Sequence, residues 1–180
     1  LLEIMQDWNI WNEELDTGTE RADYLERCSK LLKANVVITI IGIRRAGKSY
    51  IMRQTIKKLA EKGMEKKNIL MVNFEDKRFT EFYPKLLDEI YEAYLEFLMP
   101  SNQQFIFLDE IHNVPKWERW VRTMHELGKA KIIISSVFWQ GNPYEVIRRG
   151  VLGEFQLVIS TEILDEAVNI ASSTKISGFD

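Results

Sequence analysis

Residues 36–49 read VVITIIGIRRAGKS, and this stretch decides the fold. Its first half is an apolar run rich in β-branched residues, which is typical of a strand buried in a parallel sheet. Its second half, Gly42 to Ser49, fits the pattern G-x-x-x-x-G-K-[ST]. The pattern follows a predicted strand and opens a predicted helix at 48–61, which is the context that a phosphate-binding loop requires.

The chemistry of phosphate binding explains each fixed position of this loop. Gly42 and Gly47 let the backbone curl so that its N–H groups point at phosphate oxygens. Lys48 reaches the β- and γ-phosphates and is a predicted catalytic residue, while the Ser49 hydroxyl is a predicted Mg²⁺ ligand. The positive end of the helix adds to the attraction. The predicted nucleotide-binding residues are Gly42, Ile43, Arg44, Arg45, Ala46, Gly47, Lys48, Ser49 and Tyr50.

A second site element follows the apolar strand FIFL at 105–108, which runs into Asp109 and Glu110. Ligands of parallel sheets bind at the carboxyl edge of the strands, where these acids would lie. We expect Asp109 to hold the shell of the Mg²⁺ ion, and Glu110 to orient or deprotonate the attacking water as a catalytic residue.

Strands and helices alternate along the chain. Predicted strands at 68–74, 105–109 and 131–135 are separated by a helix at 85–98 and by another whose first turn suits Pro115, and a further helix at 20–33 precedes the first strand. The helix at Pro115 carries a stripe that we expect to be core rather than ligand site: Trp117, Trp120, Val121 and Met124. This order predicts an α/β fold with a parallel sheet covered by helices on both faces. We divide the chain into an N-terminal helical segment (1–35), a P-loop core (36–135) and an atypical tail (136–180).

Composition limits the function classes. The chain has 180 residues, 46% apolar and 28% charged, with a net charge of −3, so bulk charge indicates neither nucleic-acid nor membrane binding. We find no apolar run long enough for a bilayer and no signal-peptide pattern, so a cytoplasmic location is expected. The single cysteine, Cys28, is predicted to be a small buried residue rather than part of a disulfide or zinc site.

The segments GIRRAGKS, NFEDKRF (73–79) and FLDEIHNVPKWERW (107–120) resemble archaeal and bacterial AAA-type P-loop ATPases over about residues 20–135. The resemblance implies a three-layer AAA-like core, ATP as the nucleotide, Mg²⁺, and a small polar γ-phosphate sensor at Ser135 and Ser136. The usual Gly-Ser-Ser of the family is only Ser-Ser here. The resemblance implies that Arg44 and Arg45 lie near the phosphates or near a partner subunit. The alternative is that they are two solvated charges.

The tail departs from the ATPase pattern, because no lid and no Gly-Arg pair are recognisable after Ser136, as if the core were truncated at the C-terminus. Residues 133–167 are similar to the N-terminal half of PIN-domain ribonucleases. The Asp-Thr-Asn triplet of those enzymes is replaced by Lys129-Ala130-Lys131, which leaves Glu166 as a lone matching acid, so we do not expect nuclease activity. The other explanation is an ATPase that diverged here.

Three functions remain open: an ATPase, a nucleotide-binding module with little turnover because lid and arginine finger are missing, and an inactive PIN nuclease fusion. The expected partner is ATP, and a homo-oligomer or a protein partner is left open. The tail also carries a prediction about the sheet. The apolar run Phe155–Ser160 should pair beside Val36–Ile41 as a fifth strand, with 144–149 and 161–171 as helices.

Overall fold

A parallel sheet forms the centre of the computed structural model, which describes residues 1–42, 45–137 and 156–159. Over these residues the strands follow the order β2-β3-β4-β1-β5, and every neighbouring pair is parallel. The strands are β1 (Ile38–Gly42), β2 (Ile69–Asn73), β3 (Gln104–Asp109), β4 (Ala130–Val137) and β5 (Gln156–Ile159).

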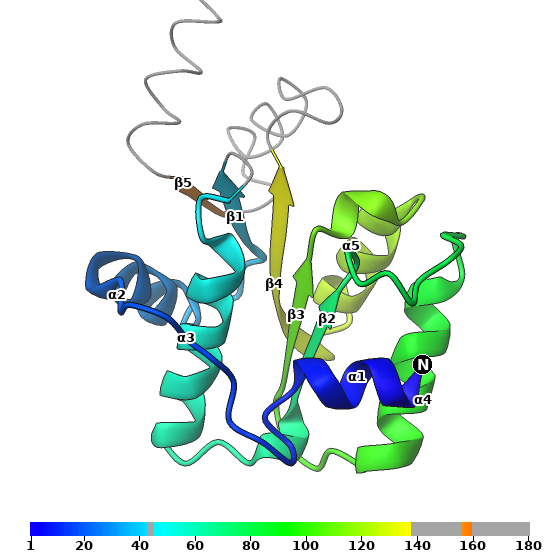
Figure 1. Cartoon of the computed structure of the whole chain (residues 1–180), viewed down its shortest axis with the longest axis horizontal. Helices are drawn as coiled ribbons and strands as arrows, with labels where there is room; N and C mark the ends of the chain where they lie inside the picture. Colours follow the sequence, from blue (N-terminus) through cyan, green and yellow to red (C-terminus); the bar gives the residue numbers. More distant parts are fainter. Residues whose placement is uncertain (43–44, 138–155, 160–180) are drawn as a thin grey trace, which may run out of the picture.

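Helices cover both faces of the sheet, as Figure 1 shows. On one face lie α1 (Leu2–Trp8), α4 (Leu86–Leu98) and α5 (Trp117–Glu126), and on the other lie α2 (Ala22–Leu31) and α3 (Lys48–Glu61). Two short 3₁₀ turns, η1 (Lys66–Asn68) and η2 (Ile111–Asn113), precede β2 and follow β3. The predicted three-layer α/β fold is therefore confirmed.

Strands β2, β3 and β4 supply both faces with apolar side chains, because successive side chains point to opposite sides of a sheet. Leu70 and Val72 of β2 pack against α4 and α5, whereas Ile69 and Met71 pack towards α3. All four are almost fully buried. Burial on both faces explains why the strands read as continuous apolar runs rather than alternating ones.

The predicted fifth strand is confirmed. β5 pairs in parallel with β1, with Ile38 opposite Gln156 and Ile41 opposite Ile159. The predicted helices at 144–149 and 161–171 lie outside the described residues. β4 runs over Ala130–Val137, beyond the predicted 131–135.

The prediction that Pro115 lies in the first turn of a helix is wrong. α5 begins at Trp117, because Lys116 before it adopts a left-handed conformation with φ of 61°. The aromatic stripe of this helix is part of the core, as predicted. Val121 and Met124 are buried, and both tryptophans of the stripe pack against the same cluster.

The N-terminal segment closes the outer edge of β2. The Asn9 side chain takes the place of a neighbouring strand: its amide nitrogen donates to Met71 O at 2.7 Å, and its oxygen accepts from Met71 N at 2.6 Å. The same nitrogen donates to Met5 O at 2.6 Å, and Trp11 Nε1 donates to Ile69 O at 2.8 Å. Backbone groups that an edge strand leaves unpaired are thereby satisfied.

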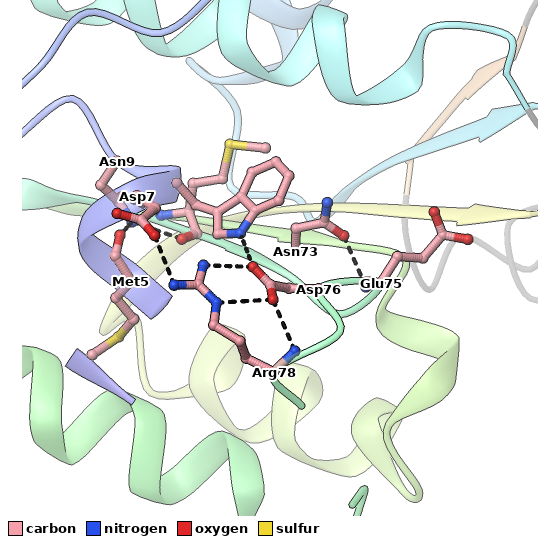
Figure 2. A network of polar contacts seen from close by, with 9 residues as sticks. Met5, Asp7, Asn9, Asn73, Glu75, Asp76 and Arg78 are labelled. Atoms are coloured by element: carbon pink, nitrogen blue, oxygen red, sulfur yellow. Dashed lines mark hydrogen bonds and ion pairs between the residues drawn. The ribbon is translucent and has the colours of Figure 1, made fainter. Parts of the chain in front are cut away.

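A polar network ties α1 to the loop after β2, as Figure 2 shows. Asp76 accepts hydrogen bonds from Trp8 Nε1 and from Arg78 Nη2, both at 2.7 Å, and Arg78 Nη1 lies 2.7 Å from Asp7. The Arg78 guanidinium holds the pKa of Asp76 well below its usual range. The loop with the sequence NFEDKRF is therefore held by the segment that closes the β2 edge.

None of the helices in the ranges described above has the length and apolarity needed to cross a membrane.

Replacing Asn9 by Ala should lower the free energy of unfolding by about 2 to 3 kcal/mol, because the buried N–H and C=O of Met71 lose their partners. Urea denaturation measures the change. Asn102→Ala is the control, since this exposed amide donates to the exposed Glu65 Oε1 at 3.3 Å, and the variant should stay within about 0.5 kcal/mol of wild type. Equal stability of the two variants would contradict the role of Asn9.

Candidate active site

Strand order brings the loop and the acidic pair to one place. β4 lies between β1 and β3, so the loop after β1 and the acids after β3 meet at the carboxyl edge, roughly 10 Å apart as two strand spacings. Ser135 of β4, paired with Ile40 of β1, lies between them. The site thus forms where the strand order of the sheet places three carboxyl ends together.

Lys48 connects the two halves of this site. It occupies the first position of α3 and is only 5% exposed. Its Nζ lies 3.1 Å from Glu110 Oε1 and donates to Gly42 O at 3.2 Å. Gly47, just before it, has a left-handed conformation with φ of 84°, which glycine adopts without strain. The loop therefore ends by directing a buried ammonium group at the acidic pair.

Ser135 fixes the geometry of the acidic pair. Its hydroxyl donates to Asp109 Oδ1 and accepts from the Glu110 N–H at 3.0 Å. Glu110 adopts a left-handed conformation, with φ of 54° and ψ of 41°, which costs a non-glycine residue on the order of 1 kcal/mol. Because one hydroxyl bonds both residues, Ser135 holds this turn in place. Ser135 is also one of the two residues predicted to sense the γ-phosphate.

The carboxyl group of Glu110 has a pKa raised by its surroundings. Burial raises its pKa above the usual value; the nearby Lys48 ammonium opposes that shift, and the carboxylates of Asp109 and Glu75 add to it. His112 Nδ1 lies 3.4 Å from Glu110 Oε2. A carboxylate with a raised pKa accepts a proton more readily than one in water.

Asp109 and Ser49 carry oxygen atoms of the kind that Mg²⁺ prefers as ligands. Asp109 is fully buried, and its Oδ2 has no hydrogen-bond partner in the part of the chain that the structure describes. Ser49 lies in the first turn of α3 beside the loop. The described residues contain no group of three His, Cys, Asp or Glu that could hold a metal. Mg²⁺ commonly takes one or two protein oxygens and completes its shell with water and phosphate.

The structure brings together five of the predicted site residues: Gly42, Lys48, Asp109, Glu110 and Ser135. Ile43 and Arg44 lie outside the described residues, and Ser136 is described only as part of the β4 backbone. Arg45 is exposed, with φ of 66°.

Two other predicted residues, Ala46 and Tyr50, contact the N-terminal segment instead. The Ala46 carbonyl accepts a hydrogen bond from Arg21, and the Tyr50 hydroxyl lies 3.4 Å from Asp16 Oδ2. Sequence reasoning did not single out Arg21 as a site residue. It stands in an unremarkable charged stretch, and its contact with the loop joins residues 25 positions apart.

A phosphate loop ending in a buried lysine, beside an acidic pair on a nearby parallel strand, defines a P-loop nucleotide-binding domain of the ATPase type. Comparison with family models gives a match to the AAA domain over residues 34–137, more than half of the chain. The protein belongs to this AAA-domain family.

Two curated relatives carry no assigned activity. An uncharacterized protein of Methanocaldococcus jannaschii is 34% identical over 94 residues, which are 52% of this chain and 20% of the relative. An uncharacterized protein of Haemophilus influenzae is 29% identical over 117 residues, 64% of this chain and 28% of the relative. The chain therefore spans less than a third of the length of these relatives.

Solved structures give looser likenesses. Caenorhabditis elegans PCH-2 aligns with 77% of this chain and 40% of its own at 13% identity and a TM-score of 0.47. The DnaC helicase loader aligns with 83% of this chain and 97% of its own at 17% identity and a TM-score of 0.45.

Replacing Ser135 by Ala should lower the free energy of unfolding by about 1 to 3 kcal/mol, because the Glu110 N–H and a carboxylate oxygen of Asp109 lose a buried partner. The matched control is Thr39→Val, at a buried strand hydroxyl that has no partner among the described residues. It should be neutral or stabilising. Thermal and urea unfolding of both variants test the contrast, and a neutral Ser135→Ala would refute it.

Proposed function

We propose that this domain binds ATP together with Mg²⁺ and hydrolyses it to ADP and phosphate. The observation that supports this most directly is the buried contact at 3.1 Å between Lys48 of the loop and Glu110 of the acidic pair. Side chains with predicted roles in phosphate binding and in water activation thus lie next to each other at the carboxyl edge of a parallel sheet.

Phosphate binding would change the partner of Lys48. In the structure its ammonium is held by Glu110 and by Gly42 O. Phosphate oxygens in the loop compete for that ammonium, and Glu110 is then free to orient a water molecule. The water oxygen forms a bond to the γ-phosphorus, the bond from that phosphorus to the bridging oxygen breaks, and Glu110 accepts the proton of the water.

Bound Mg²⁺ supplies neutralisation of charge on the β- and γ-phosphate oxygens. Ser49 and Asp109, whose Oδ2 has no hydrogen-bond partner among the described residues, are the residues that would hold it. Ser135 keeps the Asp109 carboxylate in one orientation through its hydroxyl. Second-sphere contacts of this kind orient metal ligands.

The same lysine contact supports a second candidate, a nucleotide-binding module with little turnover. A Glu110 that stays paired with Lys48 cannot act on water, and then binding would proceed without hydrolysis. The third candidate, an inactive PIN nuclease fusion, stays a prediction. Glu166 and most of residues 133–167 lie outside the described part of the chain.

ATP with Mg²⁺ at a hundredfold excess over Kd should raise the free energy of unfolding by about 2.7 kcal/mol. The Lys48→Ala variant should lose most of this gain, because the ammonium is a principal phosphate contact. Differential scanning fluorimetry with and without nucleotide measures the gain within each variant. Lys57→Ala, which removes an exposed lysine of the same helix, should keep it. An equal gain in Lys48→Ala and Lys57→Ala would contradict the assignment of Lys48 as a phosphate contact.

The Glu110→Gln variant should bind ATP but release phosphate at least about tenfold more slowly, equivalent to ~1.4 kcal/mol in the barrier. An amide keeps the shape of the carboxyl group and cannot take the proton. Steady-state phosphate release measures turnover, with Glu118→Gln in the first turn of α5 as the control. Turnover at the wild-type rate in Glu110→Gln would exclude the catalytic role. The absence of turnover in wild type, with binding intact, would favour the binding module.

A further inference from the structure

Residues 16–21, here called the strap, run along the first turns of α3 and end one residue before α2. One buried side chain of α3 holds the backbone of the strap. The Gln54 amide nitrogen donates to Thr17 O and to Thr19 O, both at 2.7 Å, and its oxygen accepts from Arg21 N at 3.1 Å. Gln54 is only 4% exposed, so the side-chain end of these partly buried bonds is shielded from water.

Close packing also fixes the strap at its other end. Gly18 has φ of 58°, and a Cβ there would lie 2.9 Å from the ring of Tyr50 on α3. The carbonyl of Asp16 accepts from Arg53 Nη1 at 3.2 Å. The strap therefore has one defined position relative to the helix that begins at the phosphate loop.

This position carries the side chain of Arg21 onto the loop. Arg21 Nη1 donates to Ala46 O at 2.7 Å. The guanidinium also lies against Gly47, where a Cβ would come within 2.6 Å of Nη2. The φ of 84° favours glycine at position 47, and a side chain there would displace the guanidinium.

We propose that Arg21 is a positioning residue that holds the phosphate loop in its nucleotide-binding conformation. The inference rests on the proposed function. In a trans peptide the C=O and N–H point in opposite directions. Arg21 holds the Ala46 carbonyl on the side of the strap, so the N–H of Gly47 in the same peptide points away from the strap. A loop whose amides are ordered in advance loses less entropy when it binds phosphate.

The test compares Arg21→Ala with wild type by titration calorimetry with ATP and Mg²⁺ and by steady-state kinetics. We expect Kd and KM to rise about five- to tenfold, the scale of one charge-assisted hydrogen bond. At saturating ATP, kcat should stay within about twofold of wild type, because Arg21 contacts the loop and not the acidic pair. Arg21→Lys should recover part of the affinity, since an ammonium can still donate to Ala46 O.

The control variant is Glu20→Gln, which breaks another contact between the strap and α3, the Glu20–Lys58 ion pair at 3.2 Å. Its affinity for ATP should equal that of wild type. Wild-type affinity for ATP in Arg21→Ala would overturn the proposal. An equal loss of affinity in Glu20→Gln would also overturn it, because the loss would then come from general loosening of the strap.

A readout without nucleotide separates this proposal from the proposed function. In the NMR spectrum of the nucleotide-free protein, the Gly47 amide resonance should move in Arg21→Ala and stay in place in Glu20→Gln. An unmoved resonance in Arg21→Ala overturns the positioning role whatever the protein binds. Failure of wild type to bind ATP, with the resonance moving as expected, would overturn the proposed function and with it the part of this proposal that concerns nucleotide affinity.

Discussion

Charge removed from water at the carboxyl edge of the sheet constrains the whole structure. Lys48, Asp109 and Glu110 are 5%, 0% and 6% exposed, and a buried charge without a partner costs several kcal/mol. Each of these groups has a partner from another element. Lys48 forms an ion pair with Glu110, and Asp109 accepts a hydrogen bond from Ser135 of β4. A slip of β4 by one residue would turn Ser135 to the opposite face of the sheet, where its hydroxyl could no longer bond Asp109 and Glu110. The bonds of Ser135 therefore link the acidic pair to the observed register of β4.

The segment before β1 packs as part of the core. It begins on the face of α4 with Met5, closes the outer edge of β2 with Asn9, and continues along α3 to Arg21 at the phosphate loop. One continuous stretch of chain thus contacts both faces of the sheet and the candidate site. A loop that is short and glycine-containing gains its order from such outside contacts, since glycine itself restricts the backbone least.

The pattern of the chain predicts most of this arrangement, because local chemistry governs it. The apolar runs, the loop from Gly42 to Ser49 and the acids after FIFL each have a physical reason to be where they are, and β5 was predicted from the open edge of β1. The remaining features depend on contacts across many residues. The bonds of Ser135 to Asp109 and Glu110 and the bond of Arg21 to Ala46 appear only once the strands are in place. The positive φ angles of Glu110 and Lys116 are likewise not predicted by any sequence pattern.

The closure of the β2 edge by Asn9 depends on two parts of the chain that are synthesised at different times. Asn9 and Met71 are separated by 62 positions, so during synthesis the amide side chain leaves the ribosome well before the backbone that it will bind. Until the N-terminal segment returns to the sheet, β2 exposes unpaired peptide groups that can recruit a strand from another molecule. The contacts of Asn9 thus protect this edge of the sheet from pairing with another molecule.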